Sequence, residues 1–310
     1  YSANFYLPFH ILIGLAIFAA LSSTVSEMIS CKGSDNLSVP LITFFTYEIF
    51  LINYTHNTLL HLLIWSALSV FIFSIAKKYH SLKLSGALGG FLIGILIFGS
   101  GGWKLIFPLV FFFISSSLLS FSKHKSPSQR DVMQILANGG IPTFFALSYF
   151  FFPHQNFLLG FLGSLSASTA DTWATEIGFL SKQRPYLIFT SKQVDKGISG
   201  SISLIGSIGS IIGATAMGVI SLYIFDLNLF LAILIVFSGF FGSFIDTLLG
   251  RYSQGKFFCA SCNKTKEDGY GCCGKTILKS GFRWVNNNTV NFLSSLSSGV
   301  AIILINLVYG

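Results

Sequence analysis

Two aspartates stand in apolar segments in which a charged side chain is costly. Asp171 lies in the small-residue run 164–178 and Asp246 lies in a similar run, 242–250, and each is followed by threonine. If these segments cross a membrane, the cost of an ionisable group makes each aspartate a functional candidate. Two carboxylates from different helices at one membrane depth would bind Mg²⁺, which takes one or two carboxylates plus phosphate oxygens. The alternatives are a structural ion pair for Asp171 and a water-exposed helix end for Asp246.

Glu176 is a third carboxylate in the first of these runs. On a helix that turns about 100° per residue, Asp171 and Glu176 point about 140° apart and cannot share one face. We therefore expect them to have different partners, such as a metal ion and a basic side chain. We assign catalytic roles to Asp171, Glu176 and Asp246, although a structural ion pair explains Glu176 equally well. Close helix packing alone explains the small residues around them.

A further polar feature is a loop that precedes an expected helix and is rich in lysine, glycine and serine. Such a loop suits phosphate, because backbone N–H groups and the positive end of the helix dipole face the anion. The candidate phosphate-binding residues are Lys192, Lys196, Ser199, Gly200 and Ser201. A helix cap preceded by lysines that set membrane topology explains the same loop equally well.

Asparagines in two apolar segments could supply amides to the same site. Asn138-Gly139-Gly140 permits a helix bend and presents an amide within the membrane, although a packing kink is a competing explanation. Asn291 lies about one turn inside the last segment, where Asn288 would be the helix cap. We count Arg130, Asn138, Gly139, Gly140 and Asn291 as further phosphate- or nucleotide-binding candidates.

Four of the five cysteines cluster in one polar loop, residues 251–285. Cys259 and Cys262 form a Cys-x2-Cys pair, and Cys272 and Cys273 follow after nine intervening residues. This arrangement resembles a small zinc knuckle with four thiolate ligands. Because Cys272 and Cys273 are adjacent and a cytoplasmic loop disfavours disulfides, four reduced thiols are the open alternative.

Composition determines which elements position these residues. Of the 310 residues 52% are hydrophobic and 10% are charged, against about 25% charged in soluble domains. Apolar runs of about 20 residues cross a hydrocarbon core of roughly 30 Å, and continuous runs exclude a membrane β-barrel. We predict an all-α, polytopic transmembrane helix bundle of about 8–10 spans. The candidate spans are 5–25, 37–53, 58–76, 86–102, 105–121, 132–152, 156–179, 200–224, 228–250 and 288–308.

The basic residues indicate how these spans are oriented. If Lys77 is cytoplasmic, the four polar loops from Lys77 to Arg283 that lie on that side contain 17 of the 19 Lys and Arg residues. Lys32 also falls inside, so Lys104 alone lies outside. This is the positive-inside rule. The net charge of +8 is therefore explained by topology rather than by nucleic-acid binding, and the loop 251–285 is expected to be cytoplasmic.

Five stretches together resemble the integral-membrane phytyl-phosphate kinase family, which includes animal transmembrane protein 19. They are residues 131–140, 167–178, 196–213, 242–254 and 286–291, and the likeness covers roughly residues 60–310. The run Ala-Asp-Thr-Trp-Ala at 170–174 is more specific than any single glycine motif. The resemblance also implies kinship with CTP-dependent polyprenol kinases. In those, Asp-x-x-Ala precedes Lys-Ser-x-x-Gly-Ser, and residues 171–174 and 196–201 follow that order here, with glycine in place of the first serine.

The resemblance implies a membrane kinase that transfers a phosphoryl group from CTP, or another nucleoside triphosphate, to an isoprenoid monophosphate such as phytyl phosphate. Asp171 and Asp246 would bind Mg²⁺. An N-terminal membrane segment, residues 1–57, would stand outside a kinase-family transmembrane domain, residues 58–310. Two alternatives remain: a cytidylyltransferase that forms a CDP-lipid, and a transporter of a lipid phosphate or another anion.

Overall fold

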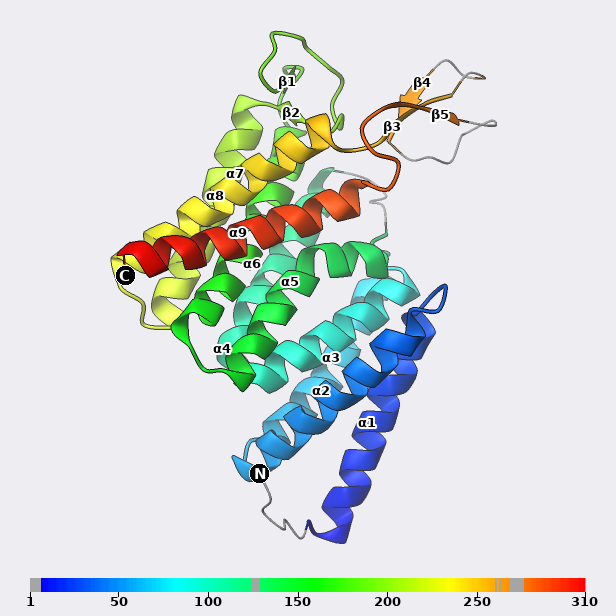
Figure 1. The fold of residues 1–310 in the computed structure, drawn as a ribbon, viewed down its shortest axis with the longest axis vertical. Helices are drawn as coiled ribbons and strands as arrows, with labels where there is room; N and C mark the ends of the chain where they lie inside the picture. The colour runs from blue at the N-terminus through cyan, green and yellow to red at the C-terminus, as the bar shows by residue number, and fades with distance from the viewer. Residues whose placement is uncertain (1–6, 124–128, 260, 262–263, 268–275, 310) are drawn as a thin grey trace. The chain divides into compact units, whose positions relative to one another are not determined.

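The computed structural model describes residues 7–123, 129–259, 261, 264–267 and 276–309, and helices dominate this part of the chain (Figure 1). The helices are α1 (Phe9–Ile29), α2 (Asp35–Thr55), α3 (Leu59–Lys78), α4 (Leu84–Lys123), α5 (Val132–Phe151), α6 (Gln155–Gly178), α7 (Leu204–Ile224), α8 (Leu229–Tyr252) and α9 (Asn287–Tyr309). The strands are β1 (Tyr186–Leu187), β2 (Ser201–Ile202), β3 (Lys256–Cys259), β4 (Lys264–Lys266) and β5 (Thr276–Ser280). The predicted all-α, polytopic membrane class is confirmed.

Each predicted span falls on a helix, and α4 contains two of them. Its 40 residues are interrupted at Gly101 (φ −160°, ψ 19°) and Gly102 (φ 59°, ψ −145°). The positive φ of Gly102 is a conformation that residues with a Cβ rarely adopt. In the described part of the chain, seven helices are long and apolar enough to cross a membrane. Helices α5 and α6 are not among them, because their polar and small residues lower the hydropathy.

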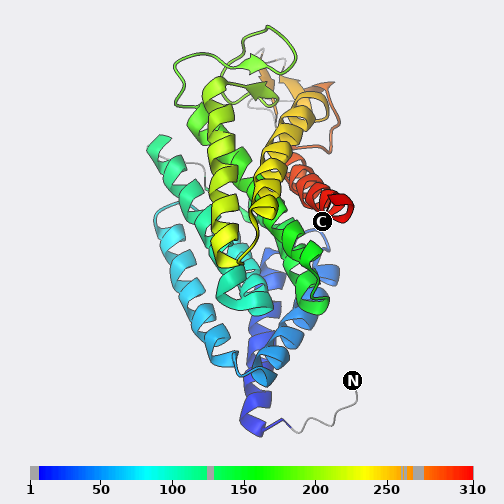
Figure 2. The ribbon, with the colours of Figure 1, turned by 90° about the vertical axis from the view of Figure 1, so that its left-hand side faces the viewer.

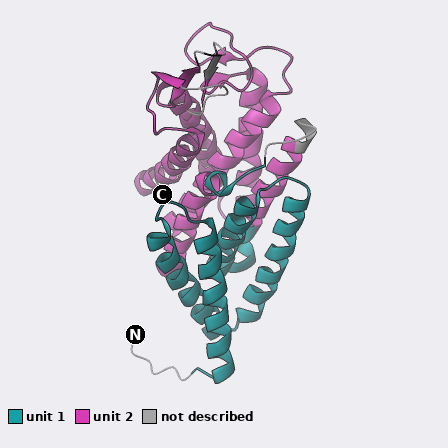
Figure 3. Ribbon diagram, turned by 90° about the vertical axis from the view of Figure 1, so that its right-hand side faces the viewer, with its two compact units in different colours: residues 1–106, 128–135 teal, residues 107–127, 136–310 magenta. Residues whose placement is uncertain are grey.

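The chain divides into two compact units (Figure 3). Unit 1 contains residues 1–106 and 128–135, and unit 2 contains residues 107–127 and 136–310. The boundary lies inside α4, just beyond its glycine break. Sequence reasoning placed a division at residue 57 instead, and that division remains a prediction about family membership rather than about packing.

Polar side chains join the helices of unit 1 across apolar surfaces. The Asn53 amide donates to Gly99 O at 3.0 Å, and the Trp65 indole donates to Gly94 O at 3.0 Å. A Cβ at Gly99 would lie 2.2 Å from Ile49 Cγ2, so glycine is required for α2 to approach α4 this closely. Small residues at such contacts are typical of helix pairs in membranes.

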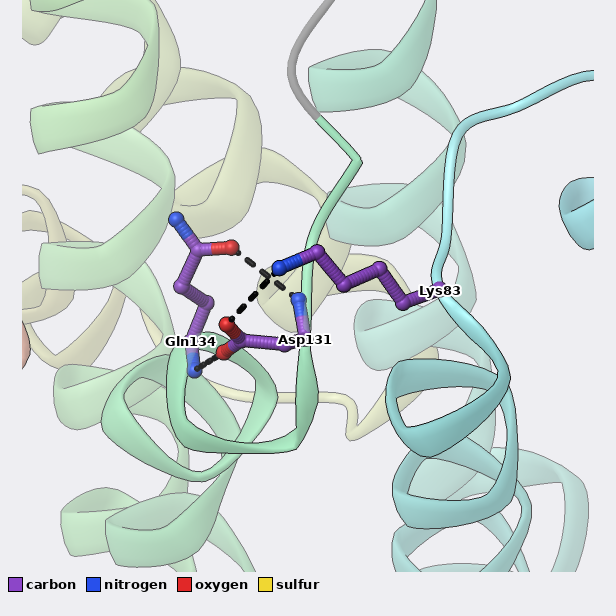
Figure 4. A network of polar contacts seen from close by, with 3 residues as sticks. All are labelled: Lys83, Asp131 and Gln134. Atoms are coloured by element: carbon purple, nitrogen blue, oxygen red, sulfur yellow. Dashed lines mark hydrogen bonds and ion pairs between the residues drawn. The ribbon is translucent and has the colours of Figure 1, made fainter.

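The start of α5 is fixed by a reciprocal pair of side-chain hydrogen bonds (Figure 4). The backbone N–H of Gln134 donates to Asp131 Oδ1 at 3.2 Å, and the N–H of Asp131 donates to Gln134 Oε1 at 3.1 Å. Lys83 Nζ lies 3.5 Å from Asp131 Oδ2. This capping box satisfies two N–H groups at the helix start that lack partners within the helix.

Helix α6 is the centre of unit 2, where it packs against α7, α8 and α9 (Figure 2). Every residue from Leu158 to Ala170 is buried. A Cβ at Gly242 would lie 2.4 Å from the Cβ of Ala167. Ser298 Oγ lies 2.9 Å from Gly163 O and 2.7 Å from Ser238 O, which links α9 to both α6 and α8. Close packing therefore accounts for the small residues of α6, as sequence reasoning allowed.

Both small sheets lie at one end of unit 2, where α6 and α8 end and α7 and α9 begin (Figures 1 and 2). Strands β1 and β2 pair antiparallel, with Tyr186 opposite Ile202. The second sheet has the order β4-β3-β5, and both pairings are antiparallel. This end of unit 2 contains most of the candidate site residues.

Candidate active site

Asp171 and Asp246 meet at the sheet-bearing end of unit 2, although 75 positions separate them in the sequence. Asp171 belongs to α6 and Asp246 to α8, and the two carboxylates are close enough for their charges to interact. Both side chains are partly buried. Packing of α6 against α8 through small residues therefore brings together two carboxylates that repel each other unless a proton or a cation lies between them.

Polar side chains from α9 and α5 surround this carboxylate pair. In the amide orientation that satisfies both of its ends, Asn291 Nδ2 donates to Asp246 Oδ2 at 3.0 Å and to Asn287 O at 3.0 Å. In the opposite amide orientation, Asn291 Nδ2 instead donates to Asn138 Oδ1 at 3.4 Å. Ser294, one turn further along α9, lies close to Asp246, and its hydroxyl donates to Asn291 O at 3.0 Å. The expectation that Asn138 and Asn291 reach a shared polar site therefore agrees with the geometry.

Helix α5 is joined to the same cluster through its backbone. Ser168 Oγ, on α6, donates to Asn138 O at 3.0 Å. Of the two glycines that follow, Gly139 is buried and its carbonyl accepts from Thr143 Oγ1 at 2.7 Å, while Gly140 faces the ring of Phe292. Asn138 is the residue of this motif whose side chain lies beside the carboxylate cluster, and the assignment of Gly139 and Gly140 to phosphate remains a prediction.

Glu176 lies on another side of α6. Ser120 Oγ, from the end of α4, donates to Glu176 Oε1 at 2.7 Å, and Trp173 Nε1, one turn earlier, donates to Ser115 Oγ at 3.3 Å. Asp171 and Glu176 thus have different partners, as the helical angle between them predicts. The contact of Glu176 described here is with a hydroxyl, and its pairing with a basic side chain remains a prediction.

The predicted phosphate-binding loop is not the start of a helix. Helix α7 begins at Leu204, and its cap is Ser203, whose side chain accepts from Gly206 N at 3.0 Å. Ser199 and Gly200 form a turn, and Ser201 belongs to β2. The expected span start at residue 200 is therefore wrong by four residues, because β2 pairs with β1 before the helix can begin. The donors of this loop come from a turn rather than from a helix end.

The two lysines of this loop have different surroundings. Lys196 Nζ donates to Phe179 O at 3.0 Å and also to Ser181 O, so it satisfies carbonyl groups just beyond the end of α6. Lys192 is exposed, and its backbone N–H donates to Thr190 Oγ1 at 3.3 Å. The geometry favours a structural role for Lys196, whereas the Lys192 side chain remains accessible.

Ser199 takes part in the main polar contact that sequence reasoning missed. Its backbone N–H donates to Glu267 Oε1 at 2.8 Å and its hydroxyl donates to Glu267 Oε2 at 2.6 Å. Gln254 Nε2 donates to Glu267 Oε2 at 3.0 Å, and Lys256 Nζ donates to Ser199 O at 3.3 Å. Glu267, Gln254 and Lys256 all lie in the polar loop after α8, where no periodicity or spacing distinguishes them.

The start of α9 and the place of Arg130 complete the comparison with the predicted site residues. The cap of α9 is Asn286, whose Oδ1 accepts from Thr289 N at 3.0 Å, rather than Asn288, which lies inside the helix. Arg130 belongs to unit 1, where its backbone pairs with the segment before α4: its N–H donates to Ser81 O at 3.1 Å, and its carbonyl accepts from Lys83 N at 2.9 Å. Its assignment to phosphate remains a prediction.

Three of the four cysteines of the polar loop lie outside the described residues. Cys259 is buried on β3, but Cys262, Cys272 and Cys273 lie outside the described part, so the zinc hypothesis remains a prediction. Among the described residues, no three His, Cys, Asp or Glu side chains are grouped as a metal site. A cavity of about 470 Å³ lies at the opposite end of unit 2, between the α5–α6 and α7–α8 turns, and so is separate from the carboxylate pair.

The profile of the family described as Integral membrane protein DUF92 matches residues 67–299. Uncharacterized membrane protein MJ0933 of Methanocaldococcus jannaschii is 30% identical over 210 residues, which cover 65% of this chain and 87% of that protein. Protein PGR of Arabidopsis thaliana is 31% identical over 255 residues, 71% of this chain and 87% of its own length. Protein VTE6, chloroplastic, of the same plant is 25% identical over 260 residues, which cover 76% of this chain and 69% of that protein. No solved structure matches the chain.

Proposed function

The chain belongs to the DUF92 family of integral membrane proteins, and from this premise we propose that it is a membrane kinase acting on an isoprenoid monophosphate such as phytyl phosphate. CTP is the favoured phosphoryl donor. The resemblance of its sequence motifs to phytyl-phosphate kinases gives the reaction class. The observation that carries the proposal is the meeting of Asp171 and Asp246 beside the amides of Asn138 and Asn291.

The side chains of this cluster suit Mg²⁺. They offer carboxylate and amide oxygens, which are the ligands of a hard cation, and two carboxylates are the number that Mg²⁺ usually takes from a protein when phosphates complete its coordination. Asp171 and Asp246 would hold the ion, and their close approach would then cost less than it does between two bare charges. A bound Mg²⁺ would neutralise negative charge on the transferring phosphoryl group.

The remaining residues position groups rather than move protons. The acceptor is itself a phosphate, whose oxygens are largely ionised near neutral pH, so the reaction needs no strong general base. Catalysis of phosphoryl transfer depends mainly on alignment and on charge stabilisation. Asn291 would orient the carboxylate of Asp246, and the Asn138 amide lies beside it. We propose a structural role for Glu176, because it lies on another side of α6, where Ser120 of α4 donates a hydrogen bond to it.

The distribution of basic residues supports an orientation for the site. The loops at the sheet-bearing end of unit 2 carry most of the Lys and Arg residues of that unit. By the positive-inside rule this end would face the cytoplasm, where nucleotides are available. The isoprenoid tail would then lie among the apolar helix surfaces, with its phosphate at the level of Asp171 and Asp246.

The test is a transfer assay with purified protein in detergent, phytyl phosphate, Mg²⁺ and CTP or ATP labelled at the γ-phosphate. We expect label in the lipid diphosphate, and we expect Asp171→Asn and Asp246→Asn to abolish it. Asp195→Asn, an exposed aspartate whose carboxylate lies 3.9 Å from Arg184, is the matched control for the loss of one negative charge. Absence of γ-label from the lipid, with the protein folded, would refute the kinase. Label from the α-phosphate would instead identify a CDP-lipid-forming enzyme.

A further inference from the structure

A protein carboxylate, that of Glu267, is held by donors from two other segments at the sheet-bearing end of unit 2. Both oxygens of Glu267 accept hydrogen bonds from other segments: Oε1 from Ser199 N at 2.8 Å, and Oε2 from Ser199 Oγ at 2.6 Å and Gln254 Nε2 at 3.0 Å. These donors come from the turn before α7 and from the end of α8. We call the group formed by Ser199, Gln254 and Lys256 the anion cradle.

The cradle is built into the protein rather than formed by surface side chains that happen to meet. Gln254 is 2% exposed, and a buried amide is costly unless it has a hydrogen-bond partner. Lys256 is half-buried, and its Nζ donates to Ser199 O at 3.3 Å. Burial lowers the pKa of Lys256, Glu267 raises it, and the nearby Arg251 lowers it further. The cradle therefore combines directed N–H and O–H donors with the cationic side chain of Lys256, and Arg251 lies nearby.

The cradle is attached to the helix that carries Asp246. Gly200 has a φ of +80°, and a Cβ there would lie 2.6 Å from Arg251 Cα, so the turn lies directly on the backbone of α8. A Cβ at Gly250 would lie 3.1 Å from Gly200 N. Four residues along a helix correspond to about 6 Å. The contact between the turn and α8 is thus about one helical turn beyond Asp246, which is within the length of a polyphosphate.

Chemically, a carboxylate in such a site resembles a phosphate oxygen pair. Backbone N–H, hydroxyl, amide N–H and ammonium groups are the donors that proteins use for phosphate. Glu267 presents two oxygens and one negative charge to them, whereas a terminal phosphate presents three oxygens and a larger charge. A phosphate group bound here would make the same contacts and gain additional attraction from Lys256 and Arg251.

We propose that the anion cradle binds a phosphate group of the substrates and that Glu267 is a built-in competitor, which must leave before that phosphate can bind. This proposal rests on the proposed function for the identity of the ligand, because that function requires two phosphate-bearing substrates. The phosphate could belong to the nucleotide or to the lipid headgroup. Occupation of the cradle by Glu267 would lower the apparent phosphate affinity by the fraction of molecules in which the cradle is open.

Direct binding of pyrophosphate tests the proposal without requiring turnover. The measurement is isothermal titration of the detergent-purified full chain with pyrophosphate, without Mg²⁺, so that the carboxylate pair contributes little. In Glu267→Gln the amide would direct N–H groups at the donors of the cradle, and in Glu267→Ala the competitor is absent. If Glu267 closes the cradle in about nine molecules of ten, both variants bind pyrophosphate about tenfold more tightly.

Two sets of variants distinguish competition from a general change in charge. Asp195→Asn removes one negative charge from an exposed position of the preceding loop and is expected to leave pyrophosphate binding unchanged. Adding Ser199→Ala or Lys256→Gln to Glu267→Gln should reverse the gain. The proposal is overturned if neither Glu267 variant binds more tightly, or if Asp195→Asn tightens binding to the same extent.

Kinetics then identify the source of the phosphate. If Glu267→Gln lowers the KM for CTP and not that for phytyl phosphate, the cradle belongs to the nucleotide, and the reverse result assigns it to the lipid headgroup. The two proposals fail separately. Tighter pyrophosphate binding without any transfer to lipid would retain the cradle and refute the kinase. Transfer activity with unchanged pyrophosphate binding would retain the kinase and refute the competitor role of Glu267.

Discussion

Replacing Asn291 with alanine tests whether the polar side chains around the carboxylates act as one unit. The Asn291 amide donates to Asp246 Oδ2 at 3.0 Å and lies beside the Asn138 amide. In Asn291→Ala, Asp246 still has Ser294 close by but loses the hydrogen bond from the Asn291 amide. We expect its carboxylate to turn away from Asp171, because their charges repel each other when no cation is bound.

The expected loss follows from the kind of hydrogen bond removed. A hydrogen bond to a charged group contributes about 1.5–3 kcal/mol. Since about 1.4 kcal/mol corresponds to a factor of ten in rate, the variant should transfer phosphate about 10- to 100-fold more slowly. Asn291 would act as a positioning residue for Asp246. The Mg²⁺ concentration that gives half the maximal rate should therefore rise as well.

The assay measures initial rates of γ-label transfer from CTP to phytyl phosphate over a range of Mg²⁺ concentrations. The control is Ser297→Ala, which removes a hydrogen bond of 2.7 Å from Ser297 Oγ to Leu293 O within α9 alone. Thermal unfolding in detergent shows whether either variant has lost its fold. A folded Asn291→Ala with wild-type Mg²⁺ dependence and a rate within twofold of the control would refute the role given to this amide.

Four further predictions concern the surrounding structure. Gly200→Ala should lower the unfolding midpoint more than Gly33→Ala: both have positive φ, but at Gly200 a Cβ would lie 2.6 Å from backbone, whereas at Gly33 its nearest contact is 3.8 Å away. Asp131→Ala should destabilise the protein by about 0.5–2 kcal/mol in denaturant titration, through loss of the α5 cap. Lys196→Met should lower the midpoint of thermal unfolding, because the Lys196 ammonium binds two carbonyl groups. If Lys196 bound phosphate instead, the substitution would raise the KM for the nucleotide and leave the midpoint unchanged. Burial lowers the pKa of Lys256 below 10.5, so the unfolded chain binds this proton more tightly than the folded protein does. The free energy of unfolding should therefore rise as the pH increases from the pKa of the folded state to that of the unfolded state. Lys256→Gln should remove this rise when unfolding curves are measured as a function of pH.

The sequence predicts the helices well because each is defined by its own residues. Apolar length locates every span to within a few residues, and the glycines at 101 and 102 mark the break in α4. The carboxylates at 171 and 246 are recognised because a charge in an apolar helix needs an explanation. These signals are local, so the helices and the two carboxylates could be recognised without knowing which helices are neighbours.

What the sequence does not predict depends on long-range contacts between loops. Glu267 lies 68 positions from Ser199, and nothing in the polar loop distinguishes it from the other charged residues there. Lys196 resembles a phosphate ligand in sequence, yet its ammonium binds carbonyl groups at the end of α6. The start of α7 is displaced because β2 pairs with β1, and a two-residue strand has no periodicity that a sequence pattern could reveal.

The position of the proposed site follows from where backbone donors are available in a helical membrane protein. Inside a span each N–H already bonds to a carbonyl of its own helix, so the spans can contribute carboxylates and amides but few donors for an anion. Donors must come from turns beyond the helix ends, as they do at Ser199. Helix α8 joins the two kinds of group, because Asp246 and the Gly250 contact with the cradle lie one turn apart on the same rigid element. A site that needs both a cation and a phosphate is therefore best placed at the end of this helix.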